Sequence, residues 1–138
     1  MPKSKGFTLV ELLITISIIS VLAAIGLVVY SSVIKQGRDS KRQSDLRSIQ
    51  SALEQYYADQ FSYPSAPLPV SPNPLKSPNN LKTYINQMPS DPNSSRRYYY
   101  AITGTSYELC AALEISPNPA QSCGGSCGSN CNFKVTPP

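Results

Sequence analysis

One carboxylate in this chain stands where carboxylates are rarely found. Glu11 follows Gly6 by five residues, at the start of an apolar block that reaches Tyr30. A carboxylate inside a lipid-embedded helix costs roughly 2.5 kcal/mol or more unless a partner neutralises it. A cut between Gly6 and Phe7 would create an ammonium group about one helical turn from Glu11, where the helix dipole also favours negative charge. The spacing therefore predicts that such a cut supplies the partner.

Four cysteines form a second group with chemical potential, and all of them lie after residue 109: Cys110, Cys123, Cys127 and Cys131. They can form two disulfides in three connectivities, among which the sequence does not decide. A four-cysteine zinc site is the alternative. Three residues separate each of the last three cysteines, whereas zinc knuckles use paired two-residue spacers. We expect disulfides and no metal.

Enzymatic chemistry is not indicated. The chain has no histidine, no glycine-rich phosphate loop and no carboxylate pair at acid–base spacing. We therefore expect no enzyme, no catalytic residue and no cofactor.

The net charge of +4 is spread along the chain, so nucleic acid is not an expected partner. The alternative is a stacking platform for single strands, made by Tyr98–Tyr100 beside Arg96 and Arg97.

The element that must position Glu11 is long enough to cross a membrane. From Leu12 to Tyr30, about 19 residues at about 1.5 Å each match a hydrocarbon core of roughly 30 Å. An ordinary secretory signal, with Lys3 and Lys5 as its charged start, and a plain signal anchor are the alternatives. The block is longer than the usual signal core and lacks a clear small-x-small exit.

Residues 5–12, KGFTLVEL, resemble the class III signal of type IV pilins and of the pseudopilins of type II secretion. The resemblance implies that a membrane-embedded prepilin peptidase cuts after Gly6. It implies that the amine of Phe7 is then methylated. It also implies that Glu11 engages the amino terminus of a neighbouring subunit during filament assembly.

Beyond Tyr30 the apolar pattern becomes one-sided, and no proline appears before Pro64. We expect one helix from Phe7 to about Asp59. Its second half carries an apolar stripe, which we expect to be a core face rather than a partner-helix zipper. The stripe consists of Leu46, Ile49, Leu53 and Tyr56 or Tyr57. The predicted wet side carries Arg38, Asp39, Arg42, Asp45 and Arg47.

The segment from Phe61 to Pro92 contains eight prolines, which exclude a long helix or a central strand. We expect an ordered loop with one or two helical turns within Leu81–Met88; a disordered linker is the alternative. Residues 97–102 and 106–114 alternate in polarity around a glycine-containing turn, which predicts a β-hairpin packed on the stripe. A short strand is expected within residues 132–135.

These observations predict an α+β fold: a long amino-terminal α-helix, transmembrane in its first half and amphipathic in its second, packed on a small antiparallel sheet in a pilin-like manner. The expected parts are a leader at 1–6, a transmembrane and assembly helix at 7–30, and an amphipathic continuation at 31–60. Residues 61–138 are expected to form a proline-rich loop and a small sheet with a cysteine-rich tail.

The function that the resemblance implies is that of a structural subunit of a type IV pilus-like filament. The resemblance implies prepilin peptidase, the same chain and other pilins as partners. It also implies a single-pass location in the inner membrane, amino terminus in the cytoplasm, before assembly into an extracellular or periplasmic filament. The basic residues just after the span would favour the opposite orientation. The alternatives are a pseudopilin of a type II secretion system and a membrane-anchored binding module that does not polymerise.

Overall fold

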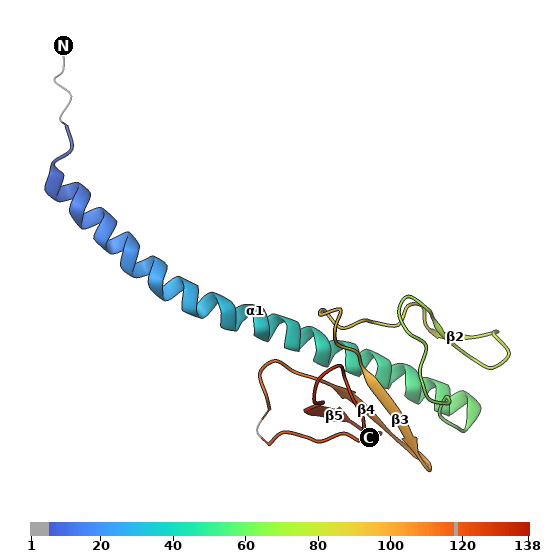
Figure 1. The fold of residues 1–138 in the computed structure, drawn as a ribbon. Helices are drawn as coiled ribbons and strands as arrows, with labels where there is room; N and C mark the ends of the chain where they lie inside the picture. Colours follow the sequence, from blue (N-terminus) through green and yellow to red (C-terminus); the bar gives the residue numbers. More distant parts are fainter. Residues whose placement is uncertain (1–5, 118) are drawn as a thin grey trace. The chain divides into compact units, whose positions relative to one another are not determined.

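The computed structural model describes residues 6–117 and 119–138 of the chain (Figure 1). The chain divides into two compact units, Met1–Lys35 and Gln36–Pro138. The described residues form one helix and two antiparallel sheets, one of two strands and one of three. The predicted α+β class, with a long amino-terminal helix and a small antiparallel sheet, is confirmed.

Helix α1 spans Leu9–Gln60. It begins two residues later than expected and passes through Gly26 and Gly37 without interruption, because a glycine in a helix costs only about 1 kcal/mol relative to alanine. The predicted stripe is confirmed as a core face: Leu46, Ile49 and Leu53 are fully buried and Tyr56 nearly so. Tyr57, the other candidate for the last stripe position, is partly exposed.

The three-stranded sheet has the order β3-β4-β5, with β3 at Tyr99–Thr103, β4 at Ser106–Ala111 and β5 at Phe133–Val135. Thr103 pairs with Ser106, and Gly104 in the turn adopts φ +62°, a conformation that glycine enters without a steric penalty. The predicted hairpin and final strand are confirmed, although β4 ends three residues before the expected Glu114.

One prediction for the proline-rich segment is wrong. Leu81–Met88 holds no helical turn; instead β2 at Thr83–Ile85 pairs with β1 at Leu75–Lys76 in a two-stranded antiparallel sheet. Tyr84 in β2 packs its ring against Tyr56 of α1, with centroids 5.1 Å apart. This tertiary contact favours an extended backbone, and short-range pattern reasoning could not detect it.

The core of the larger unit lies between the stripe of α1 and the inner face of the three-stranded sheet. Tyr107 and Leu109 of β4 are fully buried against Leu46, Ile49 and Leu53. The Tyr107 hydroxyl donates to Glu54 of α1 at 2.8 Å, so the polar tip of this buried ring is satisfied. The sheet and the second half of α1 therefore form one hydrophobic core.

The predicted wet side of α1 is wrong for Arg42 and Asp39, which are 0% and 5% exposed. Arg42 donates Nε and Nη2 to the two carboxylate oxygens of Asp91, both at 2.8 Å. Its Nη1 donates to Asp39 at 2.7 Å and to Glu114 at 3.1 Å. Asp91 and Glu114 come from distant segments, so no helical periodicity could reveal that they bury this arginine.

The same cluster fixes the chain that follows β4. Asp39 accepts the backbone N–H groups of Glu114 and Ile115, each at 2.8 Å. Arg38 donates to both oxygens of Glu114, at 2.7 and 2.6 Å. These bonds from Arg38, with a further bond from Arg42, lower the pKa of Glu114 to about 2, although its partial desolvation opposes the shift.

The expected disulfides are present, and the structure assigns the pairing as Cys110 with Cys123 and Cys127 with Cys131. No thiolate among these four remains to bind zinc. Cys110 lies on β4, so the first bond ties the outer face of the sheet to the tail. The two bonds join cysteines that are 13 and 4 residues apart in the sequence. Closing loops of these sizes stabilises a fold by about 2 to 3 kcal/mol per bond in the chain-entropy model.

Candidate assembly site

The residues that carry the processing prediction lie just before α1. Gly6 and Phe7 precede the helix and are exposed, with Phe7 78% accessible, and Glu11 lies in the first helical turn. Residues 1–5 of the predicted leader, including both of its lysines, lie outside the described residues. Processing at Gly6–Phe7 and methylation of Phe7 therefore stay predictions, and the junction is accessible as they require.

Glu11 has a hydrogen-bonding partner that the sequence reasoning missed. Its Oε2 accepts the backbone N–H of Thr8 at 2.9 Å and the Thr8 hydroxyl at 2.8 Å. In return, Thr8 Oγ1 accepts the backbone N–H of Glu11 at 3.2 Å. This reciprocal arrangement is a capping box, and its signature is readable in the sequence as Thr8-Leu9-Val10-Glu11.

The capping box changes the interpretation of Glu11. A carboxylate at the third helical position satisfies a backbone donor and interacts favourably with the helix dipole, so it stabilises the start of α1 in a single subunit. Its side chain nevertheless remains on the exposed surface of the helix. The same oxygens can therefore accept an ammonium group from outside while the backbone cap is kept.

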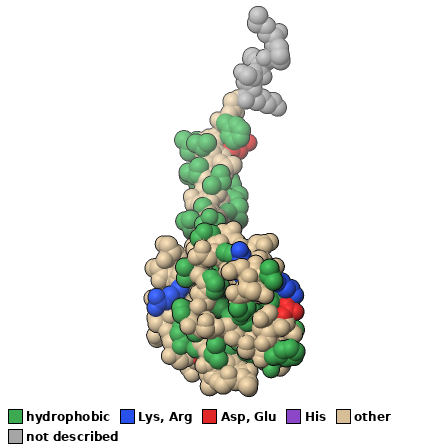
Figure 2. Space-filling model, turned by 90° about the vertical axis from the view of Figure 1, so that its right-hand side faces the viewer, with side chains coloured by type: hydrophobic (Ala, Val, Ile, Leu, Met, Phe, Trp, Pro, Cys, Tyr) green, Lys and Arg blue, Asp and Glu red, His purple; other side chains and the backbone are tan. Residues whose placement is uncertain are grey.

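The rest of the unit Met1–Lys35 presents an uncovered apolar surface. Every described large hydrophobic side chain from Leu9 to Ile34 is at least 40% exposed. Figure 2 shows hydrophobic side chains along the part of α1 next to the undescribed residues. The most apolar 18-residue segment of α1 has a mean hydropathy of 2.8, and the helix is long enough to cross a membrane. This surface needs a cover of lipid or of other apolar helices.

The tyrosines proposed as a nucleic-acid platform are engaged within the fold. Tyr98 donates its hydroxyl to Asp45 at 2.7 Å, and burial with this bond raises the pKa of that hydroxyl. Tyr100 is buried and donates to a backbone carbonyl at 2.9 Å. Tyr99 packs against the disulfides, and the backbone of Gly125 lies so close to its ring that any side chain there would collide. The three rings do not form an open stacking surface.

The residues that the structure describes provide no group of three or more metal-binding side chains. Polar chemistry in the unit Gln36–Pro138 is concentrated instead in the Arg42 ion-pair cluster, whose partners are all within the fold. That cluster holds three segments together. The end of α1 at Thr8 and Glu11 is the candidate site for assembly, because its polar groups are exposed and accessible to a second molecule.

Comparison with known families matches both halves of the chain. Residues 1–27 match the prokaryotic N-terminal methylation motif, and residues 30–113 match the model of type II secretion system protein G. No solved structure gives a significant match.

Relatives of two kinds are similar to the chain. The type II secretion system core protein G of Pseudomonas aeruginosa is 31% identical over 110 residues, which cover 75% of this chain and 77% of that protein. The core protein G of Escherichia coli is 32% identical over 98 residues, which cover 65% and 67%. The type IV major pilin protein PilA of Myxococcus xanthus is 23% identical over 133 residues, which cover 96% of this chain but only 52% of that pilin.

The protein G model covers more than half of the chain, including the second half of α1 and the β3–β4 hairpin, and it follows directly on the methylation motif. The chain therefore belongs to the type II secretion system protein G family of pilin-like proteins.

Proposed function

We propose that this chain forms a helical filament through its residues 7–30, which leave the membrane and pack against the same segment of other copies. The observation that carries the proposal is the apolar surface of α1 from Leu9 to Ile34, which the chain itself leaves uncovered. A lipid bilayer covers such a surface before assembly, and neighbouring helices cover it afterwards. Identical subunits joined by contacts that do not close into a ring generate an open filament of this kind.

The proposed sequence of events begins in the inner membrane, with the amino terminus in the cytoplasm. Prepilin peptidase removes residues 1–6, and the amine of Phe7 is methylated. In the filament, the carboxylate of Glu11 accepts this amine from a neighbouring copy. The exposed position of Glu11 in the first turn supports this role, because its oxygens are accessible while they hold the Thr8 cap.

The processing step is tested by mass spectrometry of filaments sheared from cells that carry the matching assembly machinery. We expect the mature chain to begin with methylated Phe7. Gly6→Val should block cleavage and leave full-length precursor in the membrane, because the side chain does not fit a site that accepts glycine. Gly26→Ala is the matched control, since an added methyl group at that glycine meets nothing within 4 Å. Mature protein that begins near Gly26, or filaments that retain Met1, would contradict the proposal.

A surface pilus and a secretion pseudopilus are both consistent with these contacts. The match to protein G favours a pseudopilus, whereas the match to a major pilin over nearly the whole chain favours a surface pilus. Deletion of the chain in its host separates them. Loss of secreted proteins with intact surface filaments indicates a pseudopilin, and the reverse indicates a pilin. A binding module that does not polymerise would leave both filaments and secretion intact.

A further inference from the structure

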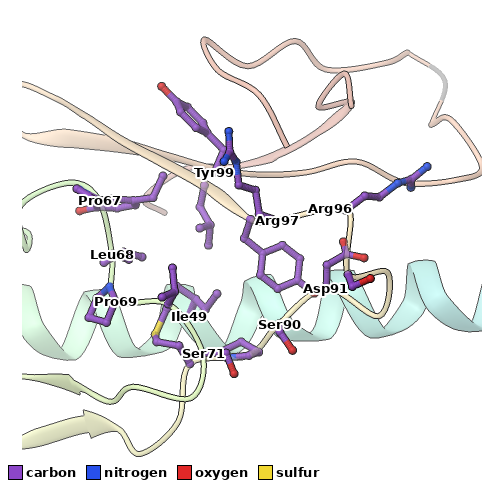
Figure 3. Close-up of a pocket in the computed structure, with 17 residues that line it drawn as sticks. Ile49, Pro67, Leu68, Pro69, Ser71, Ser90, Asp91, Arg96, Arg97 and Tyr99 are labelled. Carbon is purple, nitrogen blue, oxygen red and sulfur yellow. The ribbon is translucent and has the colours of Figure 1, made fainter. Parts of the chain in front are cut away.

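A groove of about 610 Å³ lies within the unit Gln36–Pro138, beside the start of β3. Its apolar floor includes Ile49 and Met88, and one wall is the loop of residues 67–71. Figure 3 shows Pro67, Leu68 and Pro69 across the groove from the strand that carries Tyr99. This volume is in the range of protein pockets that bind small molecules or single side chains of a peptide.

The groove follows an open sheet edge. Strand β3 is the outer strand of the order β3-β4-β5, so only one of its sides is paired within the described sheet. Thr103 and Ser106 are register partners that flank a two-residue turn. Partners in that position of a two-residue hairpin exchange both backbone hydrogen bonds, and such hydrogen-bonded pairs alternate along an antiparallel ladder. Tyr100 and Ile102 therefore direct their backbone N–H and C=O groups away from β4, toward the open edge.

The facing loop is unsuited to complete the sheet. Pro67 and Pro69 have no backbone N–H, so this segment cannot supply a regular ladder of donors to β3. Among the described residues, no backbone hydrogen bond from a loop reaches Tyr100 or Ile102. An extended segment from another molecule can supply the missing pairs, as in the strand addition seen at other open sheet edges.

Charge identifies the partner. Arg96 and Arg97 line the groove, and neither forms an ion pair among the described residues. Arg96 is partly buried and donates Nη1 to the backbone carbonyl of Ala112 at 2.7 Å, a neutral acceptor that leaves its charge without a counter-ion. Arg97 is exposed, with only a 3.3 Å bond from its Nε to the carbonyl of Ser126. Two cations at the rim of an apolar groove favour a ligand that carries carboxylates beside apolar side chains.

A second copy of this chain does not meet that requirement. All eight of its carboxylates are already engaged in ion pairs or hydrogen bonds: Glu11, Asp39, Asp45, Glu54, Asp59, Asp91, Glu108 and Glu114. Six of them already face a cation of the fold, and Glu11 and Glu54 accept hydroxyl hydrogen bonds, so a second copy presents less uncompensated negative charge to Arg96 and Arg97 than a free acidic segment does. The partner is therefore a different protein with uncommitted acidic residues.

We propose that this groove binds an extended acidic segment of another protein as a fourth strand beside β3. The segment's backbone pairs with Tyr100 and Ile102, an apolar side chain enters the groove, and flanking carboxylates pair with Arg96 and Arg97. None of the residues that line the groove belongs to the unit Met1–Lys35, which carries Glu11.

The test uses the full chain in zwitterionic detergent micelles and the capped peptide acetyl-Ser-Glu-Val-Glu-Leu-Ser-amide. Binding is followed by amide NMR shifts, with the Glu→Lys and Glu→Gln versions of the peptide as comparisons. We expect saturable shifts at Tyr100, Ile102 and Leu68 with the acidic peptide only. The double variant Arg96→Gln/Arg97→Gln should weaken binding by about tenfold or more, whereas Arg47→Gln, which changes an exposed cation on α1 outside the groove, should not.

Ile102→Pro tests the backbone pairing separately. It removes a donor that faces the open edge and leaves the β3–β4 ladder bonds in place, so the fold should persist while peptide binding is lost. If this variant does not fold, the arginine variants and the peptide comparisons still decide.

Equal binding of the acidic, neutral and basic peptides, or full binding to the double arginine variant, would overturn the proposal. Shifts at the groove that depend on protein concentration without peptide would assign it to a second copy instead. Binding of a short oligothymidylate in place of the peptide would also overturn it.

Discussion

Arg42 links three carboxylates of the larger unit, Asp39, Asp91 and Glu114. It is fully buried and joins α1 to Asp91 and Glu114, which lie far along the chain. A buried ion-pair cluster contributes less than its contacts suggest, because both charges lose their hydration. Removing one partner, however, leaves the others buried and uncompensated.

Arg42→Ala should therefore lower the free energy of unfolding by about 3 to 5 kcal/mol, measured by chemical denaturation of the full chain in micelles. Arg47→Ala is the control, because that exposed side chain of the same helix should change stability by less than about 0.5 kcal/mol. Equal stability of the two variants would show that the cluster contributes little.

The Glu114 carboxylate should make folding sensitive to acid. Its pKa is lowered from an ordinary value of 4.5 to about 2, mainly by Arg38. A carboxylate with a depressed folded-state pKa contributes stability that is complete above pH 4.5 and is lost as the pH falls through about 2. Glu114→Gln should lower stability near neutral pH and flatten its decline between these two values.

The measurement is a series of denaturation curves across that pH range. Glu108→Gln serves as the comparison, since its pair with Lys134 is about one-third exposed and exposed pairs contribute little. An unchanged slope for Glu114→Gln would rule out Glu114 as the source of acid sensitivity.

For single residues, the sequence revealed the unusual position of Glu11 but the sequence reasoning missed the Thr8 cap to which it is bonded. The Thr8-x-x-Glu11 pattern is local and could have been recognised. The burial of Arg42 could not, because nothing in the local pattern around Arg42 indicates that Asp91 and Glu114 would come to it from 49 and 72 residues away.

Among the elements, the end of α1 carries local strain. Phe61 follows the helix with φ +53° and an 85% exposed side chain. The left-handed region costs a bulky residue about 1 to 2 kcal/mol, and asparagine or glycine is the usual residue at this point after a helix. Phe61→Asn should therefore raise the free energy of unfolding by about 1 kcal/mol.

Leu81→Asn provides the matched control for that change. Leu81 is 86% exposed but is not among the residues with positive φ, so its replacement removes exposed apolar surface without relieving the backbone. We expect the free energy of unfolding to rise for Phe61→Asn and to change little for Leu81→Asn. A loss of stability in Phe61→Asn would mean that the phenyl ring makes a stabilising contact.

The regular elements were predictable to the extent that their patterns are local. The stripe of α1 and the alternation of the β3–β4 hairpin each repeat over several turns or residues, so their type and buried face were correct. The strands β1 and β2 are two and three residues long, within a proline-rich segment. They are held by packing of Tyr84 on α1, which is a long-range contact. The disulfide pairing likewise depended on tertiary structure.

For the whole molecule, the family and the apolar helix lead to one account. The chain is a structural subunit of the pilus-like or pseudopilus kind, not an enzyme, and it assembles into filaments with other pilins. Its apolar amino-terminal helix, which is long enough to cross a membrane, and its family point to membrane anchoring followed by a filament outside the cytoplasm. The disulfides are consistent with an oxidising environment for the larger unit.

The central claim is that Glu11 acts in assembly through its charge and not only through its cap. The most direct measurement is filament yield relative to membrane-bound subunit for wild type, Glu11→Gln and Thr8→Val, with leader cleavage checked in each. Glu11→Gln removes the charge and retains an amide oxygen that can cap the helix, whereas Thr8→Val removes the capping hydroxyl and keeps the charge.

We expect all three chains to be cleaved. Glu11→Gln should lose most filaments, because the amine of Phe7 would be left unpaired in a low-dielectric core at a cost of about 3 to 5 kcal/mol, and Thr8→Val should assemble nearly as well as wild type. Assembly of cleaved Glu11→Gln at the wild-type level, or equal losses in both variants, would contradict this account.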